Sequence, residues 1–135
     1  MSDKYLVVGA TGSIGSNLAE QLVASDKEIH LVGRNENQTQ SLEEKLNCNY
    51  TIANVLEDGF VEKIRSDIQD IKGIAYCVGS IDLKPLRMVN EDDFNKCMKL
   101  NLYSAVNLIK GFQETLKNNK GYCFIFNCSS TKRFY

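Results

Sequence analysis

Short apolar runs alternate with helix-like runs along the whole of this 135-residue sequence. The apolar runs predict strands buried on both faces, and apolar residues spaced three and four apart predict helices. The predicted strands are Tyr5–Val8, Glu28–Val32, Asn49–Ile52, Gly73–Val78 and Tyr122–Cys128, and the predicted helices are Ile14–Ala24, Glu36–Leu46, Gly59–Ile68 and Glu91–Lys117. Strands and helices that alternate in this way predict a parallel sheet covered by helices on both faces.

The length fits one domain with its own core, which we expect to span residues 1–135. Right-handed crossovers then predict an α/β fold, the doubly wound parallel sheet known as the Rossmann fold, with three layers α/β/α and strand order 3-2-1-4-5. Such sheets bind ligands beyond the carboxyl ends of their strands. The residues that follow each strand are therefore the candidate site residues.

Charge and hydropathy narrow the classes of partner. With 16 basic and 17 acidic residues the net charge is −1, which favours neither a nucleic acid nor a membrane surface as partner. No apolar run approaches the roughly 20 residues of a membrane helix. Residues 1–4 lead directly into the first predicted strand, so we expect no signal peptide. These features predict a cytoplasmic protein.

The five cysteines contain no C-x-x-C pair, and His30 is the single histidine. We therefore expect neither a metal site nor a disulfide framework. Cys77, Cys123 and Cys128 fall in predicted strands, where a free cysteine packs as a small hydrophobe. His30 also falls in a predicted strand, and we expect it to be structural.

Three glycines at intervals of three join the first predicted strand to the first helix, in the sequence GATGSIG. In a dinucleotide-binding turn Gly9 would permit the tight turn, Gly12 the approach of a pyrophosphate, and Gly15 the close packing of helix on strand. The N–H groups of the helix N-terminus would face the phosphates. A glycine-rich turn without a ligand is the alternative. The loop residues expected to bind the cofactor are Gly9, Thr11, Gly12, Ser13, Ile14 and Gly15.

The ends of the second and third strands bear on the choice of cofactor. An acid after the second strand suits the 2′-hydroxyl of NAD, whereas arginine suits the 2′-phosphate of NADP. This sequence has Arg34 and Asn35 there and no acid, so we expect NADP, with NAD less favoured. A solvated arginine in a turn is the alternative. After the third strand Asn54, beside Val55, can bond an adenine edge, although Asn is also common in turns.

The last two strands lead to the expected place of the chemistry. Cys77, Val78 and Gly79 are small enough for a cofactor ribose to lie against the backbone. Asn101 falls on the apolar side of the long predicted helix, where a buried amide must be hydrogen-bonded; a polar residue at the margin of that stripe is the alternative. Ser130 follows the fifth strand.

With these residues in view, the sequence resembles the short-chain dehydrogenase/reductase family along its whole length. The segments that carry the resemblance are Gly9–Gly15, Gly33–Asn35, Asn54–Val55, Tyr76–Gly79, Lys99–Leu102 and Asn127–Ser130. Three of them depart from the family pattern. The glycines are spaced G-x-x-G-x-x-G rather than G-x-x-x-G-x-G, Asn54 replaces an aspartate, and the Asn-Asn-Ala-Gly motif keeps only Gly79.

The resemblance implies a hydride transfer between nicotinamide and the carbonyl or alcohol carbon of a small-molecule substrate. It implies that Ser130 orients the substrate oxygen and that Asn101 supports a water in the proton relay. The family also uses a Tyr-x-x-x-Lys pair beyond the serine, and the 135 residues contain no such pair after Ser130. We therefore expect a chain truncated before its acid/base pair and inactive alone.

Two other interpretations stay open at this point. The chain could be a non-catalytic NAD(P)-binding or sensor protein, or an interaction module that recruits a partner through its fifth strand. The apolar run Phe124–Phe126 in that strand also predicts a homo-oligomer, because an apolar edge strand pairs readily with another chain. The assembly would bury either this edge or the apolar face of the predicted helix Glu91–Lys117.

Overall fold

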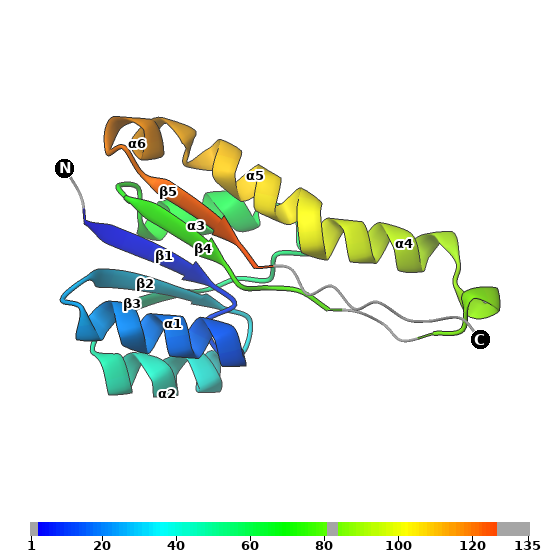
Figure 1. Cartoon of the computed structure of the whole chain (residues 1–135), viewed down its shortest axis with the longest axis horizontal. Helices are drawn as coiled ribbons and strands as arrows, with labels where there is room; N and C mark the ends of the chain where they lie inside the picture. Colours follow the sequence, from blue (N-terminus) through cyan, green and yellow to red (C-terminus); the bar gives the residue numbers. More distant parts are fainter. Residues whose placement is uncertain (1–2, 81–83, 127–135) are drawn as a thin grey trace.

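The computed structural model of the chain describes residues 3–80 and 84–126. At its centre lies a parallel sheet of five strands in the order β3-β2-β1-β4-β5 (Figure 1). The strands are β1 (Lys4–Val8), β2 (Glu28–Gly33), β3 (Asn49–Ile52), β4 (Gly73–Tyr76) and β5 (Tyr122–Ile125). The predicted fold class and strand order are confirmed. Cys128 and Ser130 lie outside the described residues.

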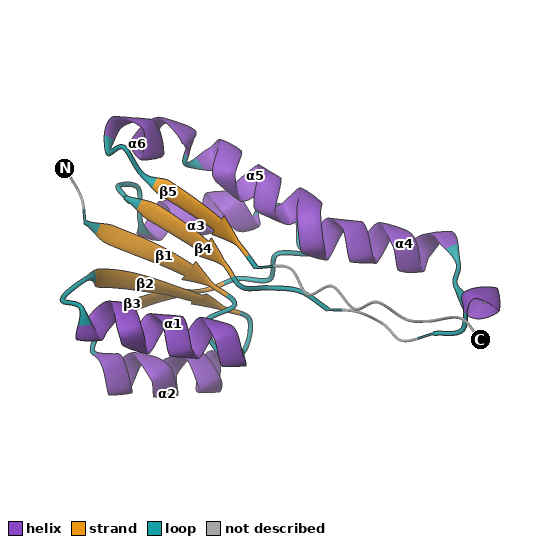
Figure 2. Cartoon of the chain, in the orientation of Figure 1, coloured by secondary structure: helices purple, strands orange, loops and turns teal. Residues whose placement is uncertain are grey.

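Helices cover both faces of the sheet and give the three layers seen in Figure 2. The helical elements are α1 (Ser13–Ala24), α2 (Glu36–Leu46), α3 (Phe60–Asp67), the 3-10 helix η1 (Leu86–Met88), α4 (Glu91–Met98), the π-helix η2 (Lys99–Tyr103), α5 (Ser104–Gly111) and α6 (Gln113–Asn118). Helices α1 and α2 pack on one face of the sheet, and α3, α5 and α6 pack on the other. Helix α4 projects beyond the carboxyl ends of the strands (Figure 1).

The core follows from the alternation of side chains along β1. Leu6 and Val8 face the cluster built with α3 and α5, whereas Val7 faces the cluster built with α1 and α2. All three side chains are at most 1% exposed. A strand buried on both faces is what the continuous apolar run predicted.

Most predicted boundaries agree with the structure to within one residue. The exceptions are β4 and β5, which end at Tyr76 and Ile125, earlier than predicted. The N–H of Cys77 still donates to the Val8 carbonyl at 2.8 Å, so the chain leaves the sheet only gradually.

The prediction of one continuous helix over residues 91–117 is wrong. The structure divides it into α4, η2, α5 and α6. The break before α6 falls at Phe112, whose backbone angles (φ −111°, ψ 12°) are not helical, directly after Gly111. Glycine weakens a helix because it loses more backbone entropy than other residues.

The apolar stripe predicted along this segment is buried only in its second half. Ala105, Leu108 and Phe112 are at most 1% exposed. In contrast, Phe94 and Met98 on α4 are 59% and 40% exposed. The stripe is therefore continuous in sequence, but only α5 and α6 lie over the described part of the sheet.

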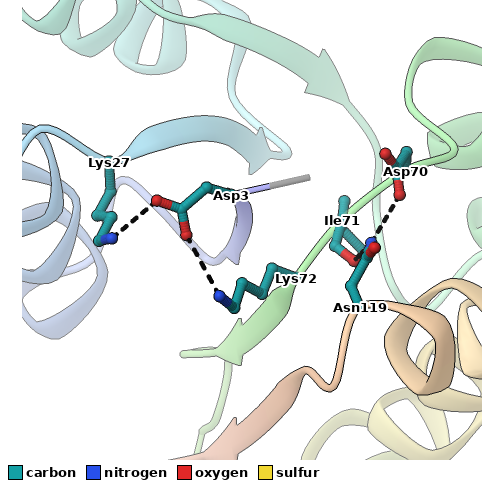
Figure 3. Close-up of polar contacts among 6 residues, drawn as sticks. All are labelled: Asp3, Lys27, Asp70, Ile71, Lys72 and Asn119. Carbon is teal, nitrogen blue, oxygen red and sulfur yellow. Dashed lines mark hydrogen bonds and ion pairs between the residues drawn. The ribbon is translucent and has the colours of Figure 1, made fainter. Parts of the chain in front are cut away.

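A group of polar contacts links the chain segments at the amino ends of the strands (Figure 3). The buried Asn119 amide, directly after α6, donates to the Asp70 carboxylate at 2.7 Å and to the Ile71 carbonyl at 2.9 Å. Asp3 pairs with Lys27 at 2.7 Å and lies 3.8 Å from Lys72. These contacts join the segments that precede β1, β2, β4 and β5.

His30 is buried on β2, and its Nε2 lies 2.7 Å from the Thr51 hydroxyl. The same hydroxyl donates to the Asp67 carboxylate at 2.5 Å. Because an ionised carboxylate only accepts hydrogen bonds, the Thr51 oxygen must accept from the Nε2–H of His30. Burial lowers the pKa of His30, which favours the neutral ring. This arrangement fits the structural role expected of His30.

None of the helices between residues 3 and 126, within the described segments, is long and apolar enough to cross a bilayer. In those same segments no three His, Cys, Asp or Glu side chains gather as a metal site would require. Cys48, Cys77, Cys97 and Cys123 are free thiols. Cys123 is exposed, so the expectation that it packs as a small hydrophobe is wrong.

Candidate cofactor site

A cleft of about 700 Å³ opens beyond the carboxyl ends of β1, β2, β3 and β4, with α4 as its far wall. Most of the residues predicted to bind a cofactor line this cleft: Gly9, Thr11, Gly12, Arg34, Asn54, Val55, Cys77, Val78 and Gly79. Ser13, Ile14, Gly15 and Asn35 do not line it in the part of the chain that the structure describes. The structure thus brings four separate strand ends into one place.

Two of the loop glycines are required by the chain itself. Gly9 has φ +79°, and a Cβ on it would lie 2.8 Å from the Val78 side chain and 2.9 Å from the Cys77 carbonyl carbon. A Cβ on Gly15 would collide with the carbonyl oxygen of Gly9. Gly9 therefore makes the turn, and Gly15 lets α1 start close behind it.

Gly12 is different, because nothing in the chain requires a glycine there. Its backbone angles (φ −74°, ψ 168°) are open to any residue. A Cβ would meet only the Gly9 carbonyl oxygen, at an ordinary 3.5 Å. The missing side chain therefore leaves free space at the mouth of the cleft, where a ligand can approach the backbone.

The first turn of α1 faces this free space without partners of its own. Within the described residues, the N–H groups of Ser13, Ile14 and Gly15 have no acceptor, and Gly12 as N-cap offers no side-chain oxygen. The first turn of α1 also contains no acidic side chain. Unpaired N–H groups and the positive end of the helix dipole make such a terminus suitable for an anion.

The two residues predicted in the turn after β2, Arg34 and Asn35, have different roles in the structure. Arg34 is exposed, lines the cleft and forms no ion pair with any described residue. The side-chain oxygen of Asn35 accepts from the Gln38 N–H at 3.0 Å and so caps α2. Only Arg34 therefore has its side chain available to a ligand.

The turn after β3 is fixed by contacts that leave some polar groups available. The Asn54 side-chain oxygen accepts from the Leu56 N–H at 3.0 Å, so only the amide nitrogen of this side chain has no partner among the described residues. The Val55 carbonyl accepts from the buried Ser104 hydroxyl at 2.7 Å. This second contact joins the turn to the start of α5.

Asn101 lies behind the segment that follows β4 rather than in the lining of the cleft. Its amide nitrogen donates to the Ser80 carbonyl at 3.1 Å and to the Cys97 carbonyl at 2.9 Å. A Cβ on Gly79 would come within 2.8 Å of the Asn101 side-chain oxygen. Asn101 therefore supports the wall formed by Gly79 and Ser80. Burial raises the pKa of the Cys77 thiol in the same wall to about 11.

A family model described as short chain dehydrogenase matches residues 4–135. The chain belongs to the short chain dehydrogenase family. No curated protein sequence matches it.

Several solved structures share the fold at low sequence identity. The KRED1-Pglu enzyme is 18% identical with a TM-score of 0.84, over 91% of this chain and 55% of that one. Serine dehydrogenase from Escherichia coli is 17% identical with a TM-score of 0.79, over 89% and 59%. A 3-oxoacyl (acyl-carrier-protein) reductase from Agrobacterium tumefaciens, described with NADP bound, is 17% identical with a TM-score of 0.78, over 89% and 50%. The chain thus spans between 50% and 59% of the length of these proteins.

Sequence analysis missed the far wall of the cleft in this member of the short chain dehydrogenase family. Leu86, Phe94, Lys84 and Lys96 line it, and Lys84 pairs with Asp93 at 2.7 Å. Strand ends can be located from a sequence pattern, but the direction in which α4 projects cannot. The capping motif from Asn90 to Asp93 was the available signal, because it fixes where α4 begins.

Proposed function

We propose that the cleft binds NADP and that this chain supplies the cofactor-binding part of an NADP-dependent short chain dehydrogenase. The observation that carries the proposal is the start of α1. Its unpaired N–H groups and the open space at Gly12 fit the diphosphate of a dinucleotide, which would satisfy the donors and the helix dipole. A turn without a ligand explains Gly9 and Gly15, but it leaves Gly12 without a reason.

The preference for NADP rests on Arg34. Arg34 lines the same cleft, and its guanidinium has no ion-pair partner among the described residues. A 2′-phosphate offers this group a charged, planar contact that a 2′-hydroxyl cannot offer. The turn after β2 also lacks the acid that would favour NAD.

Bound NADP(H) would supply the hydride acceptor or donor for a reaction at the carbonyl or alcohol carbon of a small-molecule substrate. The chain's own residues would hold the cofactor at the α1 N-terminus, at Arg34 and against the backbone of Cys77–Gly79. Asn101, in support of the proton relay, and Ser130, as the group that orients the substrate oxygen, remain predictions from the family. The cytoplasmic location is likewise a proposal.

A polypeptide of these 135 residues should turn over slowly, because it contains no Tyr-x-x-x-Lys pair after Ser130. General acid–base assistance typically contributes about 10²–10⁴ in rate. Measured NADPH consumption with a panel of ketones and aldehydes should therefore stay near background. Robust turnover would show that another residue supplies the proton. NADP binding without turnover would also be consistent with a non-catalytic binding or sensor protein.

The fifth strand supports an assembly of several copies. All four residues of β5 are exposed, and the rings of Tyr122 and Phe124, which are 55% and 57% exposed, stack with centroids 6.5 Å apart. An apolar edge strand of this kind favours pairing with another chain. We therefore propose a homo-oligomer, and a monodisperse monomer at high concentration in light scattering would contradict it.

Calorimetric titration with NADP⁺ and NAD⁺ tests the proposed cofactor, and Gly12→Ala tests the place where it binds. The alanine fits the backbone angles and local space of Gly12, so the melting temperature should stay unchanged. Its methyl group would occupy the proposed path of the diphosphate, and NADP⁺ affinity should fall at least about tenfold, or roughly 1.4 kcal/mol. If neither nucleotide binds the unaltered chain, the proposal is wrong.

A further inference from the structure

The π-helix η2 leaves one backbone carbonyl without its usual donor. In an α-helix the N–H of Ser104 would bond to the carbonyl four residues earlier, which belongs to Leu100. In this structure the Ser104 N–H bonds instead to the Lys99 carbonyl, five residues earlier. The Leu100 carbonyl therefore needs a donor from elsewhere, because a buried carbonyl without a partner is destabilising.

Tyr76 supplies that donor from the sheet. Its hydroxyl donates to the Leu100 carbonyl at 2.5 Å, and the side chain, at the end of β4, is only 1% exposed. Burial raises the pKa of Tyr76 to about 12, so the hydroxyl keeps its proton at physiological pH. Both ends of this contact are fixed, since the ring packs in the core and η2 continues into the buried start of α5.

The turn that Tyr76 holds is the one that carries Asn101. The Asn101 amide reaches the Ser80 carbonyl at 3.1 Å, and its oxygen packs against Gly79. The extra residue of a π-turn rotates the preceding part of a helix by roughly 100° relative to an unbroken α-helix. Closing the π-turn would therefore move Asn101 away from the wall of the cleft.

We propose that Tyr76 is a positioning residue, whose hydroxyl keeps the η2 turn open and thereby holds the Asn101 amide on Ser80 at the wall of the cofactor cleft. The functional role of this contact rests on the proposed cofactor site. The geometry of the contact does not depend on that site, so the geometry can be tested in the chain without nucleotide.

Tyr76→Phe removes only the hydroxyl and keeps the ring in the core. Nuclear magnetic resonance of the nucleotide-free chain should then show the Asn101 side-chain amide protons exchanging with water roughly tenfold faster, the factor expected from losing about one hydrogen bond. The backbone amide signals of Gly79 and Ser80 should shift. Tyr50→Phe is the matched control, because the Tyr50 hydroxyl accepts from Gln40 on the far side of the sheet and should leave these signals unchanged.

A merely structural role for Tyr76 would lower stability without moving the Asn101 signals, and that result would overturn the proposal. Replacing Tyr76 by 4-aminophenylalanine restores an N–H donor at the same place, and it should return the Asn101 exchange rate towards that of the unaltered chain. If Tyr76→Phe does not fold, the 4-aminophenylalanine variant provides the test. Altered Asn101 signals in that variant, when it is folded and its N–H donor is restored, would also overturn the proposal. Nucleotide titration of the same samples tests the proposed function separately.

Discussion

Helices α1 and α2 lie side by side and both begin at the carboxyl ends of the strands, yet their first turns differ (Figure 1). At α2, the Asn35 side chain caps the Gln38 N–H, and Glu36 adds a carboxylate in the first turn. At α1, Gly12 occupies the cap position, and the described residues provide neither a side-chain acceptor nor an acid.

The difference separates a helix end whose N–H groups the chain itself satisfies from one that it leaves without a side-chain cap. Helix α4 agrees with α2, because Asn90 and Asp93 form a reciprocal capping box at its start. Helix α3 also begins at a glycine without a side-chain cap, Gly59, but Glu62 lies in its first turn and Gly59 does not line the cleft. At α1, in contrast, both Gly12 and Gly9 line the cleft. We infer that the absence of a cap at α1 is part of the site, since a cap would compete with an anion for the same N–H groups.

The largest effect is expected when α1 is made to resemble α2. In Gly12→Asp the new carboxylate can cap the first turn and also repel the phosphates of a nucleotide. We expect NADP⁺ affinity to fall by roughly 100-fold or more, because juxtaposed like charges cost several kcal/mol. The free energy of unfolding should stay the same or rise by up to about 1 kcal/mol, from the cap and the helix dipole.

Calorimetric titration and urea unfolding measure these two quantities on the same protein. Weakened binding together with lost stability would point to damage at the turn and would contradict the explanation by capping. Gly12→Ala separates the effect of the methyl group from that of the charge, because it adds volume without a carboxylate.

The second effect concerns the neighbouring turn, where Arg34 faces the cleft and Asn35 does not. A hydrogen bond to a charged group contributes about 1.5–3 kcal/mol, so Arg34→Ala should weaken NADP⁺ binding by roughly 10- to 150-fold. NAD⁺ binding should hardly change, because NAD⁺ lacks the 2′-phosphate. Equal losses for both nucleotides, measured by the same titration, would remove Arg34 from the proposed phosphate site.

Features that depend on local pattern could be predicted from the sequence. The apolar runs located all five strands, and their alternation with helices set the strand order, since right-handed crossovers leave few arrangements. The turns at Gly9 and Gly15 were likewise predictable, because their geometric reasons lie within one strand–turn–helix unit.

Features that depend on distant partners could not be predicted. In η2 the Leu100 carbonyl accepts from the Tyr76 hydroxyl of β4, and nothing in the helix sequence indicates that partner. The cap that Asn35 provides is by contrast a local contact with Gln38, three residues along the chain, which the N-cap preference of Asn could have indicated, and the expected contact of Asn35 with a cofactor stays a prediction. The exposure of Phe94 was missed because periodicity shows which residues share a face but not what covers that face.

A smaller effect is expected at α2, the helix that Asn35 caps. Asn35→Ala removes the α2 cap and should lower the free energy of unfolding by about 0.5–2 kcal/mol. NADP⁺ affinity should remain within about twofold, because the Asn35 side chain points into the helix turn rather than the cleft. Urea unfolding and the nucleotide titration provide the two readings. A large loss of affinity without a loss of stability would return Asn35 to the binding site.

The smallest effect is expected at α4, whose capping box includes the titratable carboxyl group of Asp93. The hydrogen bond from Lys84, and then that from the Asn90 N–H, hold the pKa of Asp93 below its ordinary value of 3.8. The pKa of Asp93 is therefore lower in the folded chain than in the unfolded chain. The stabilisation from the charged carboxylate is present at pH values above the unfolded pKa, and it is lost as the pH falls through the folded pKa. In urea unfolding, Asp93→Asn should therefore show a weaker decline in stability below about pH 4 than the unaltered chain. The asparagine oxygen can still accept from Asn90, so the helix start is kept while the charge is removed. Identical acid profiles for the two proteins would mean that solvent screens this exposed pair completely.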